Sequence, residues 1–581
     1  MSGPLAPRWR TVASSRAVLA VVHNVTAATR LFDVLPVFAD DPRVEVTFTC
    51  PRSSAFTAGT DEHLASRGIR LMPWDEAVRY PFDLAVSASY GGDLHELRAP
   101  LLVVPHGMGY NKFLETGNRK PETGNRKPET GNRKPETGNR KPETGNRKPE
   151  TGNRKPVFGL SSPWIMHEGE LVPAYIVLSH GEQLDRLRLA VPEAAEFAVV
   201  AGDPSLDRLI ASTPLRETYR QGFGLTSTQR LVLVSSTWGG NSLYGTDPEL
   251  VRRLAHALPF DSYRIAIALH PNVHEGHSRW QVARWLNACT RAGVLVLPHE
   301  DLWRQAILAS DVVLGDHGSV TFYAAAAGKP VLLAAAPHDD LDPESPVHQL
   351  VTTAPRFDPN ADAGGQFDRA VTEHDPGRYL PITELATDLP GKAATALREL
   401  CYRALDLAPP AHPAPLHVLP APDLPIPLPR ARLARVETVR HHAKALDLRL
   451  TRHAVDTLYD PTWSAEPAQL VVHIDEPEAT LLELADVVVH DDPRDAGRWL
   501  TETLHALPGC TIAAAGLPDG SWLAGTTTAL VEITGVHGDP HALVSAVHEV
   551  LTEPHKPFPD EVTVTTETGA TVATGRFSLL R

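Results

Sequence analysis

This sequence has few cysteines, no long apolar run and no excess of positive charge. Its 581 residues include four cysteines, which stand far apart and show no metal-ligand spacing: Cys50, Cys289, Cys401 and Cys510. They are typical of buried thiols in a reducing compartment. The apolar run Ala17–Val22 is shorter than a signal-peptide core and is followed by His23-Asn24, so we interpret it as a first strand. No run has the length of a transmembrane helix. We therefore expect a cytoplasmic protein, whose membrane contact, if any, is peripheral at the inner face.

The net charge and the chain length limit the class of protein and the number of domains. The formal net charge is −15, which argues against a general nucleic-acid binder. A chain of 581 residues is long enough for about three or four domains, each with its own core.

One segment is a tandem repeat. Glu115–Pro156 consists of six identical copies of Glu-Thr-Gly-Asn-Arg-Lys-Pro and contributes a charge of +6, so the other residues carry −21. No position of the period is apolar, which excludes a coiled coil, and every unit contains glycine and proline, which break helices and strands. We predict a disordered polar loop, expanded from one original unit. A basic tether for acidic lipid or polymer is the alternative.

Short apolar runs alternate with helical segments before and after the repeat. The predicted strands are Val18–Val22, Val44–Thr49, Ile69–Met72, Leu84–Ser87, Leu101–Val104 and Ala174–Leu178, and Thr29–Phe38 is a predicted helix. This alternation predicts a parallel sheet covered on both faces, with ligands at the carboxyl ends of its strands. His106 follows Leu101–Val104 at such an end and is our candidate catalytic base. A loop histidine that caps a turn is the alternative.

The stretch Asp311–Leu333 contains a strand, a turn, a helix and a second strand. Asp311–Leu314 is the predicted first strand, and Ser319 is the predicted N-cap of a helix over Val320–Ala327. Such a turn directs backbone N–H groups and the positive end of the helix dipole toward a phosphate. An ordinary connection of an α/β protein is the alternative.

Three more predicted strands, Leu231–Val234, Ile265–Leu269 and Val294–Leu297, also end in polar residues. Four polar strand ends at one sheet edge predict a nucleotide-binding site. Its predicted donor-binding residues are Ser236, Thr237, His299, Glu300, Asp316, His317, Gly318 and Ser319.

His270 is a second candidate catalytic residue, as an acid or a phosphate ligand. The alternative is that His270 only terminates its strand. His270, His274 and His277 invite a metal site, but Pro271 and Gly276 disfavour the helix that would gather them, so no metal or other cofactor is predicted.

These patterns predict four segments. They are a Rossmann-like acceptor domain over residues 1–198, a Rossmann-like nucleotide-donor domain over 199–408, a semi-rigid proline-rich linker over 409–429, and a small accessory α+β domain over 430–581. Within the last segment we expect a basic amphipathic helix near Ala431–Leu446.

Five landmarks, in this order, resemble the CDP-glycerol glycerophosphotransferase family of teichoic-acid polymerases and primases, over about Val18 to Asp406. His106-Gly107 with Lys112 resembles the family's His-Gly-Thr-Pro-Leu-Lys, with one residue more between the glycine and the lysine. The other four are Gly202–Asp207, similar to Gly-Tyr-Pro-Arg-Asn-Asp; Ser235–Gly239, similar to Ala-Pro-Thr-Trp-Arg; His270-Pro271, similar to His-Pro; and Gly315–Ser319, similar to Thr-Asp-Tyr-Ser-Ser.

The resemblance implies an α/β protein of the GT-B fold, with two Rossmann-type doubly wound domains facing a cleft. It further implies transfer of glycerol phosphate, or a related alditol phosphate or sugar, from a nucleotide-activated donor to a hydroxyl of a polymer or lipid-linked acceptor in cell-surface polymer synthesis. His106 would be the base. Two family arginines are replaced by Ser205 and Gly239, and the family's Tyr-Ser by His317-Gly318. These departures leave open a nucleotide-sugar glycosyltransferase or epimerase of the same fold, and a non-catalytic nucleotide- or polymer-binding protein.

Overall fold

The computed structural model describes residues 11–12, 14–54, 56–57, 59–113, 155–299, 301–442, 444–455, 468–552 and 558–581. Nearly all of the repeat lies outside these ranges, so the loop predicted there stays a prediction. The chain divides into two compact units. The first comprises Met1–Asp203, His338–His348 and Leu385–Pro415, and the second Pro204–Pro337, Gln349–Glu384 and Leu416–Arg581. Among the helices of the described ranges, none is long and apolar enough to cross a membrane.

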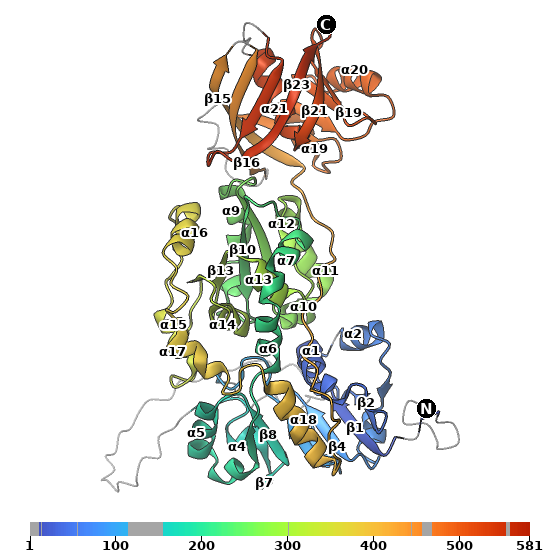
Figure 1. Cartoon of the computed structure of the whole chain (residues 1–581), viewed down its shortest axis with the longest axis vertical. Coiled ribbons are helices and arrows are strands. Elements are labelled where there is room, and N and C mark those ends of the chain that lie inside the picture. Colours follow the sequence, from blue (N-terminus) through green and yellow to red (C-terminus); the bar gives the residue numbers. More distant parts are fainter. Residues whose placement is uncertain are drawn as a thin grey trace, which may run out of the picture. The chain divides into compact units, whose positions relative to one another are not determined.

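The first unit is built on a parallel sheet of seven strands in the order β3-β2-β1-β4-β5-β8-β9 (Figure 1). The strands are β1 (Arg16–Val21), β2 (Val44–Thr49), β3 (Leu71–Met72), β4 (Leu84–Ser87), β5 (Leu101–Val103), β8 (Tyr175–Leu178) and β9 (Ala198–Val200). The chain order reverses between β1 and β4, where Val21 lies opposite Ser87. This is the strand order of a doubly wound Rossmann-type sheet, whose ligands bind at the carboxyl ends beside the reversal.

Helices cover both faces of the first sheet. They are α1 (Val25–Val34), α2 (Thr60–Ser66), α3 (Trp74–Ala77), α4 (Ser162–Ile165), α5 (Gly181–Ala190) and α18 (Ala393–Ala404). Three 3₁₀ helices, η2 (Leu35–Phe38), η3 (Leu94–Glu96) and η5 (Pro192–Phe197), and a small hairpin of β6 (Met166–His167) and β7 (Glu170–Leu171) complete this part. Leu31 of α1 and Leu397 of α18 are buried against one face, and Leu187 of α5 against the other. Helix α1 begins four residues before its predicted start because the Asn24 side chain accepts a hydrogen bond from the Ala27 N–H.

The first unit extends beyond its predicted range in three places, residues 199–203, 338–348 and 385–415. Strand β9 pairs with β8, so the first crossing of the chain falls after Asp203 and not at residue 198. Residues 385–415 also return to this unit, where Tyr402 donates a hydrogen bond to Asp41 at 2.7 Å. This return could not be predicted from the sequence, because the whole of the second sheet lies between α18 and the first sheet along the chain.

The second unit contains a parallel sheet in the order β12-β11-β10-β13-β14. The strands are β10 (Arg230–Ser236), β11 (Tyr263–Leu269), β12 (Leu295–Val296), β13 (Val312–Gly315) and β14 (Val331–Leu333). The chain order again reverses at adjacent strands, with Val234 of β10 opposite Leu314 of β13. Two Rossmann-type sheets are therefore present, as the alternation of strands and helices predicted.

The helical elements around the second sheet are α6 (Pro204–Ala211), η6 (Thr213–Leu215), α7 (Arg216–Gly222), α8 (Leu243–Thr246), α9 (Leu250–Ala257), α10 (Pro271–His277), α11 (Arg279–Trp285), α12 (Asn287–Arg291), α13 (Trp303–Ala309), α14 (Ser319–Ala326), α15 (Pro346–Thr353), α16 (Ala363–Thr372), α17 (Leu380–Thr383) and η7 (Glu384–Ala386). One face of the sheet forms a core with Val251 of α9, Val282 of α11 and Phe367 of α16. The residues of α13 from Arg304 to Ala309 are all buried.

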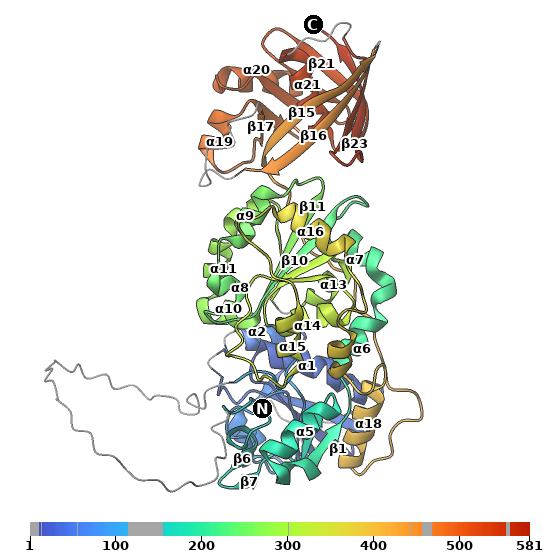
Figure 2. The ribbon, with the colours of Figure 1, turned by 90° about the vertical axis from the view of Figure 1, so that its left-hand side faces the viewer.

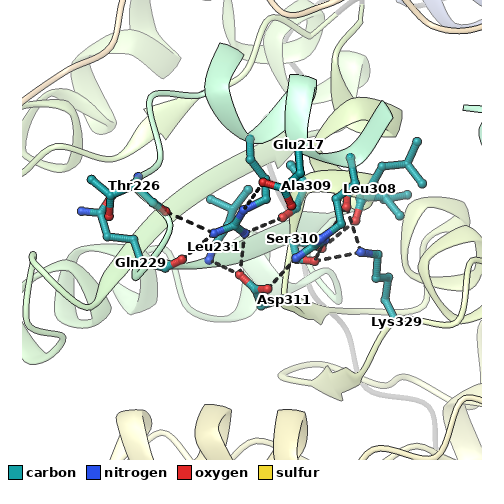
Figure 3. A network of polar contacts seen from close by, with 12 residues as sticks. Glu217, Thr226, Gln229, Leu231, Leu308, Ala309, Ser310, Asp311 and Lys329 are labelled. Carbon is teal, nitrogen blue, oxygen red and sulfur yellow. Dashed lines mark hydrogen bonds and ion pairs between the residues drawn. The ribbon is translucent and has the colours of Figure 1, made fainter. Parts of the chain in front are cut away.

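A polar network surrounds Asp311 at the amino end of β13, opposite the predicted ligand edge (Figure 3). The Asp311 carboxylate accepts hydrogen bonds from Arg216 at 2.6 Å, from Arg220 at 2.9 Å and from the Leu231 N–H at 2.8 Å. This network joins α7 to the starts of β10 and β13, so its role is to hold the sheet.

Lys329 belongs to the same network. Its Nζ donates hydrogen bonds to the carbonyl oxygens of Leu308 at 2.8 Å and Ser310 at 2.9 Å. Burial, together with the nearby Arg216 cation, lowers the pKa of Lys329 to about 7. The folded protein therefore holds this proton less tightly than the unfolded chain does.

Replacing Lys329 with Met is expected to change how stability depends on pH. Below pH 7 the folded protein carries the full free-energy cost of the buried Lys329 charge. This cost falls as the pH rises toward 10.5, where the unfolded chain also loses the proton. Across this pH window, the free energy of unfolding of the wild type should therefore rise by at least about 1.4 kcal/mol relative to that of Lys329→Met. This is the equivalent of one pKa unit. Urea unfolding at several pH values measures the gain. Lys392→Met, at an exposed lysine, is the control, and parallel curves for wild type and Lys329→Met would contradict the expectation.

The second half of the predicted linker is packed against the second unit. Leu419 is buried, its N–H donates to Ser212 Oγ at 2.9 Å, and its carbonyl accepts from the Tyr219 hydroxyl at 2.9 Å. Pro422 lies so close to Gly222 that a Cβ there would come within 2.7 Å of it. Residues 416–429 are thus an extended segment fixed to the unit's surface rather than a spacer.

The C-terminal part is a closed sheet of nine strands in the order β15-β16-β22-β23-β21-β20-β19-β18-β17. The strands are β15 (Ala431–His442), β16 (Ala445–Ala454), β17 (Gln469–His473), β18 (Val487–His490), β19 (Ile512–Gly516), β20 (Trp522–Gly525), β21 (Leu530–Gly538), β22 (Glu561–Thr565) and β23 (Thr571–Leu579), and the helices are α19 (Ala479–Leu484), α20 (Ala496–Ala506) and α21 (Pro540–Thr552). The helix predicted near Ala431–Leu446 is wrong. This segment is β15 and the start of β16, which pair antiparallel, because the alternating buried leucines of β16 provide a partner that overrides local preference.

Helix α21 and the strands of the closed sheet share one core. Leu543 and Val547 of the helix are buried with apolar residues from all nine strands. Helices α19 and α20 lie on the outside of the sheet, against β17, β18 and β19 (Figure 2). The predicted α+β content is present, but the closure of the sheet around a helix was not predicted.

Candidate functional site

His106 lies at the carboxyl edge of the first sheet, just beyond β5. Its Nδ1 is 3.1 Å from the carbonyl oxygen of Ala88, beyond β4. A carbonyl oxygen can only accept, so Nδ1 carries the hydrogen and Nε2 of the neutral ring holds the lone pair. Burial lowers the pKa of His106, and the nearby Arg30 and Lys112 cations lower it further. The ring is therefore neutral at pH 7, as a proton acceptor must be.

The loop that follows His106 is tied to the strand ends and to the segment 338–348. The Asp342 N–H donates to the Asn111 carbonyl at 2.8 Å, and Lys112 forms an isolated bridge with Leu341. The Arg186 guanidinium donates to the Tyr110 carbonyl at 2.6 Å, where Tyr110 has a positive φ of 66°. These contacts fix the backbone between His106 and Lys112.

A buried ion pair lies beside His106. Arg30 of α1 donates to the Pro105 carbonyl at 3.0 Å and to Asp203 at 2.8 Å. Arg30 is 4% exposed and Asp203 is fully buried. The pair connects the His106 segment to the Gly202-Asp203 turn, so two of the sequence landmarks come together in this unit.

Asp316 organises the carboxyl edge of the second sheet. Its buried carboxylate accepts hydrogen bonds from the N–H groups of Thr237, Leu243 and Gly318, each at 2.9 Å, and lies 3.3 Å from Ser236 Oγ. These donors come from the loop after β10 and the turn after β13, on the two sides of the strand-order reversal. The carboxylate is thus occupied by the protein, and Asp316 shapes the site rather than presenting a charge to a ligand.

The turn after β13 leads directly into helix α14. Gly318, and not the predicted Ser319, is the N-cap, and it has no side-chain capping bond. Ser319 is the first residue of the helix. A Cβ at Gly318 would lie 3.0 Å from Asp316 Oδ1 and 3.2 Å from Thr237 Cβ. The glycine therefore lets the two loops approach closely and leaves the helix N-terminus without a side-chain cap. The neighbouring His317 is 4% exposed.

His270 follows β11 at the same edge. Its Nδ1 accepts a hydrogen bond from the Asn272 N–H at 3.1 Å, which caps helix α10. With Nδ1 accepting, the neutral ring carries its hydrogen on Nε2. The expectation that Pro271 disfavours a helix is wrong, because Pro271 occupies the first turn, where its missing N–H needs no partner.

His299, beyond β12, lies in a buried cluster. Its Nε2 is 3.3 Å from Glu275 Oε1, and its ring stacks on His274 at 4.8 Å. Glu300 lies outside the described residues. In the described part of the chain, no group of three or more His, Cys, Asp or Glu side chains could hold a metal ion.

The structure brings Ser236, Thr237, Asp316 and Gly318 into one cluster, with Ser319 next to it, and places His106 on the other sheet. Sequence reasoning missed Glu275 and, in the first unit, His23. His23 directly follows the first predicted strand, so the rule that selected His106 would also have selected it. Ser205 has a neighbour that the sequence does not reveal, since Arg304 Nη1 lies 3.1 Å from Ser205 Oγ.

Both edges have the form of ligand sites in doubly wound α/β proteins. No family model and no curated protein matches the chain. Among solved structures, the chain is similar to the wall teichoic acid polymerase TagF, with 13% identity over 68% of this chain and 90% of that one and a TM-score of 0.42. It is also similar to UDP-GlcNAc 2-epimerase from Neisseria meningitidis bound to UDP-GlcNAc, with 13% identity over 67% and 99% and a TM-score of 0.37. S. aureus MnaA, solved with UDP, shows 11% identity over 68% and 98% and a TM-score of 0.39. The strand order and register of the two sheets, and not these similarities, identify both sheets as doubly wound.

Proposed function

We propose that the protein is a GT-B-type transferase that uses a nucleotide-activated donor. It moves glycerol phosphate, or a related alditol phosphate or sugar, to a hydroxyl of a polymer or lipid-linked acceptor in cell-surface polymer synthesis. The observation that carries the proposal is the state of His106, a neutral imidazole whose Nδ1–H is bound to Ala88. Its Nε2 lone pair suits removal of a proton from an attacking hydroxyl. The five sequence landmarks that resemble the CDP-glycerol family support the choice of donor class.

In this proposal the second sheet holds the donor. The donor phosphates would meet the N–H groups at the start of α14, next to Gly318 and Ser319, where no side chain caps the helix. His270, with its hydrogen on Nε2, would donate to a phosphate oxygen as negative charge develops on the leaving nucleotide. His299 and Glu300 would lie near the nucleotide base, and Ser236 and Thr237 would support the turn.

Donor binding tests this function directly. A thermal-shift screen with CDP-glycerol, CDP-ribitol, UDP-sugars and GDP-sugars should show stabilisation by one class, worth about 2.7 kcal/mol at a hundredfold excess over Kd. Gly318→Ala should weaken that shift, since the new Cβ meets Asp316 and Thr237. Gly240→Ala is the matched control, because a Cβ there meets nothing within 4 Å.

The screen also separates the alternatives. The His317-Gly318 turn, which departs from the CDP-glycerol family, favours a nucleotide-sugar transferase or epimerase as the second candidate, and selective stabilisation by UDP- or GDP-sugars would select it. Binding without turnover would select the non-catalytic binding protein. No shift with any of these nucleotides would overturn the proposed function.

A further inference from the structure

His23 lies where the strand order of the first sheet reverses. It follows β1 by two residues, and the loop after the neighbouring strand β4 runs past it. Its side chain is 1% exposed. Buried histidines are commonly part of a packed core, but this one lies at the edge where doubly wound sheets bind ligands.

The hydrogen bonds of His23 define its tautomer. Nε2 lies 2.7 Å from the carbonyl oxygen of Gly91, so Nε2 carries the hydrogen and donates it. Nδ1 is enclosed and has no hydrogen-bond partner among the residues that the structure describes. Burial lowers the pKa of His23 to about 4, and the neighbouring His106 contributes to the lowering. The ring is therefore neutral at pH 7, and its enclosed Nδ1 does not offer a contact to substrate.

His23 and His106 bind the two ends of one short loop. His106 donates to the Ala88 carbonyl and His23 to the Gly91 carbonyl. Between these carbonyls, the Ser89 N–H donates to Ser87 Oγ at 3.1 Å. The loop that fixes the His106 tautomer is thus itself fixed by His23.

The loop is packed closely against the His23 ring and Ser53. Gly92 has a positive φ of 78°, and a Cβ there would lie 2.6 Å from Ser53 Oγ. A Cβ at Gly91 would lie 3.5 Å from the His23 ring. Because the loop is packed between Ser53 and the His23 ring, the position of the Ala88 carbonyl depends on these contacts.

We propose that His23 is a positioning residue for His106. Its Nε2–H bond to the Gly91 carbonyl holds the loop 88–91 in place, and the Ala88 carbonyl of that loop holds His106 as the Nδ1–H tautomer. His23 thereby directs the Nε2 lone pair of His106 toward the open edge of the sheet. The inference rests on the proposed function for one point only, namely that this lone pair acts on a substrate hydroxyl.

The tautomer of His106 can be measured without any substrate. Full-length protein with ¹⁵N-labelled histidine is compared as wild type, His23→Gln, His23→Asn and His23→Leu, and the His106 signals are assigned by their disappearance in His106→Gln. The Gln amide reaches the place of Nε2 and keeps a donor for Gly91, whereas Asn is too short and Leu has no donor.

Wild type and His23→Gln are expected to show His106 protonated at Nδ1. In His23→Asn and His23→Leu we expect a mixture of tautomers, because the Ala88 carbonyl is no longer fixed. Circular dichroism identifies any variant that does not fold, and either of the two variants that leave the Gly91 carbonyl without a donor suffices. Unchanged His106 ¹⁵N shifts in a folded His23→Asn or His23→Leu variant would overturn the inference. If turnover is found, kcat should fall in that variant while KM for the donor stays the same. An absence of turnover would count against the proposed function and leave the tautomer result valid.

Discussion

Asp316→Ala is expected to disrupt the carboxyl edge of the second sheet and to abolish donor binding. The substitution removes the acceptor of three backbone N–H groups, those of Thr237, Leu243 and Gly318, in a buried site. Each buried donor left without an acceptor costs about 1 to 3 kcal/mol, so the loss of stability should be about 3 kcal/mol or more. For a domain of about 200 residues this corresponds to a melting temperature lower by roughly 6 to 12 °C.

Hydrogen exchange locates this effect. Peptides that contain Thr237, Leu243 or Gly318 should exchange faster in Asp316→Ala, and the nucleotide-induced thermal shift should disappear. Asp375→Ala is the control, because Asp375 also accepts a backbone N–H two residues later, from Gly377 at 2.8 Å, but in an exposed turn. Unchanged exchange in Asp316→Ala would show that the carboxylate does not hold the two loops together.

His106→Gln is expected to reduce transfer by about 100- to 10,000-fold, the range for loss of a general base. Glutamine has no basic nitrogen, so it cannot take the proton of the attacking hydroxyl. Donor binding should be unchanged, because the donor residues lie on the second sheet. The measurement is turnover with the donor that the thermal-shift screen identifies. His95→Gln, at an exposed histidine of the same unit, is the control, and full activity of His106→Gln would remove His106 as the base.

The pH dependence of transfer gives an independent check on His106. Its base form is lost as the pH falls through a pKa that burial, Arg30 and Lys112 lower from the usual 6.5. The acid limb of kcat/KM should therefore lie below pH 6.5 in the wild type. Lys112→Met removes one of the neighbouring charges and should move that limb to higher pH.

Much of the α/β architecture could be predicted because its strands are short apolar runs in a repeated order. The runs Val44–Thr49 and Leu84–Ser87 are strands over the same residues in the structure. Polar residues directly after such runs, including His106 and Asp316, could be assigned to sheet edges, since parallel strands end at the same side. Local caps were harder to predict, because Asn24 acts through one hydrogen bond and Gly318 through the close approach of two loops.

By itself, then, the sequence determined two series of alternating strands and helices and the polar residues at the ends of their strands. The C-terminal part, predicted as a domain of its own, belongs to the same compact unit as the second sheet. The tertiary structure alone decided which distant segments meet. It showed α18 on the first sheet, residues 416–429 on the second unit and a closed sheet around α21 where a helix was expected. It also showed that Asp316 is occupied by backbone donors and that His23 shares a loop with His106. The reason is physical: apolar periodicity is a local property of the chain, whereas hydrogen-bond partners and burial depend on residues that only folding brings together.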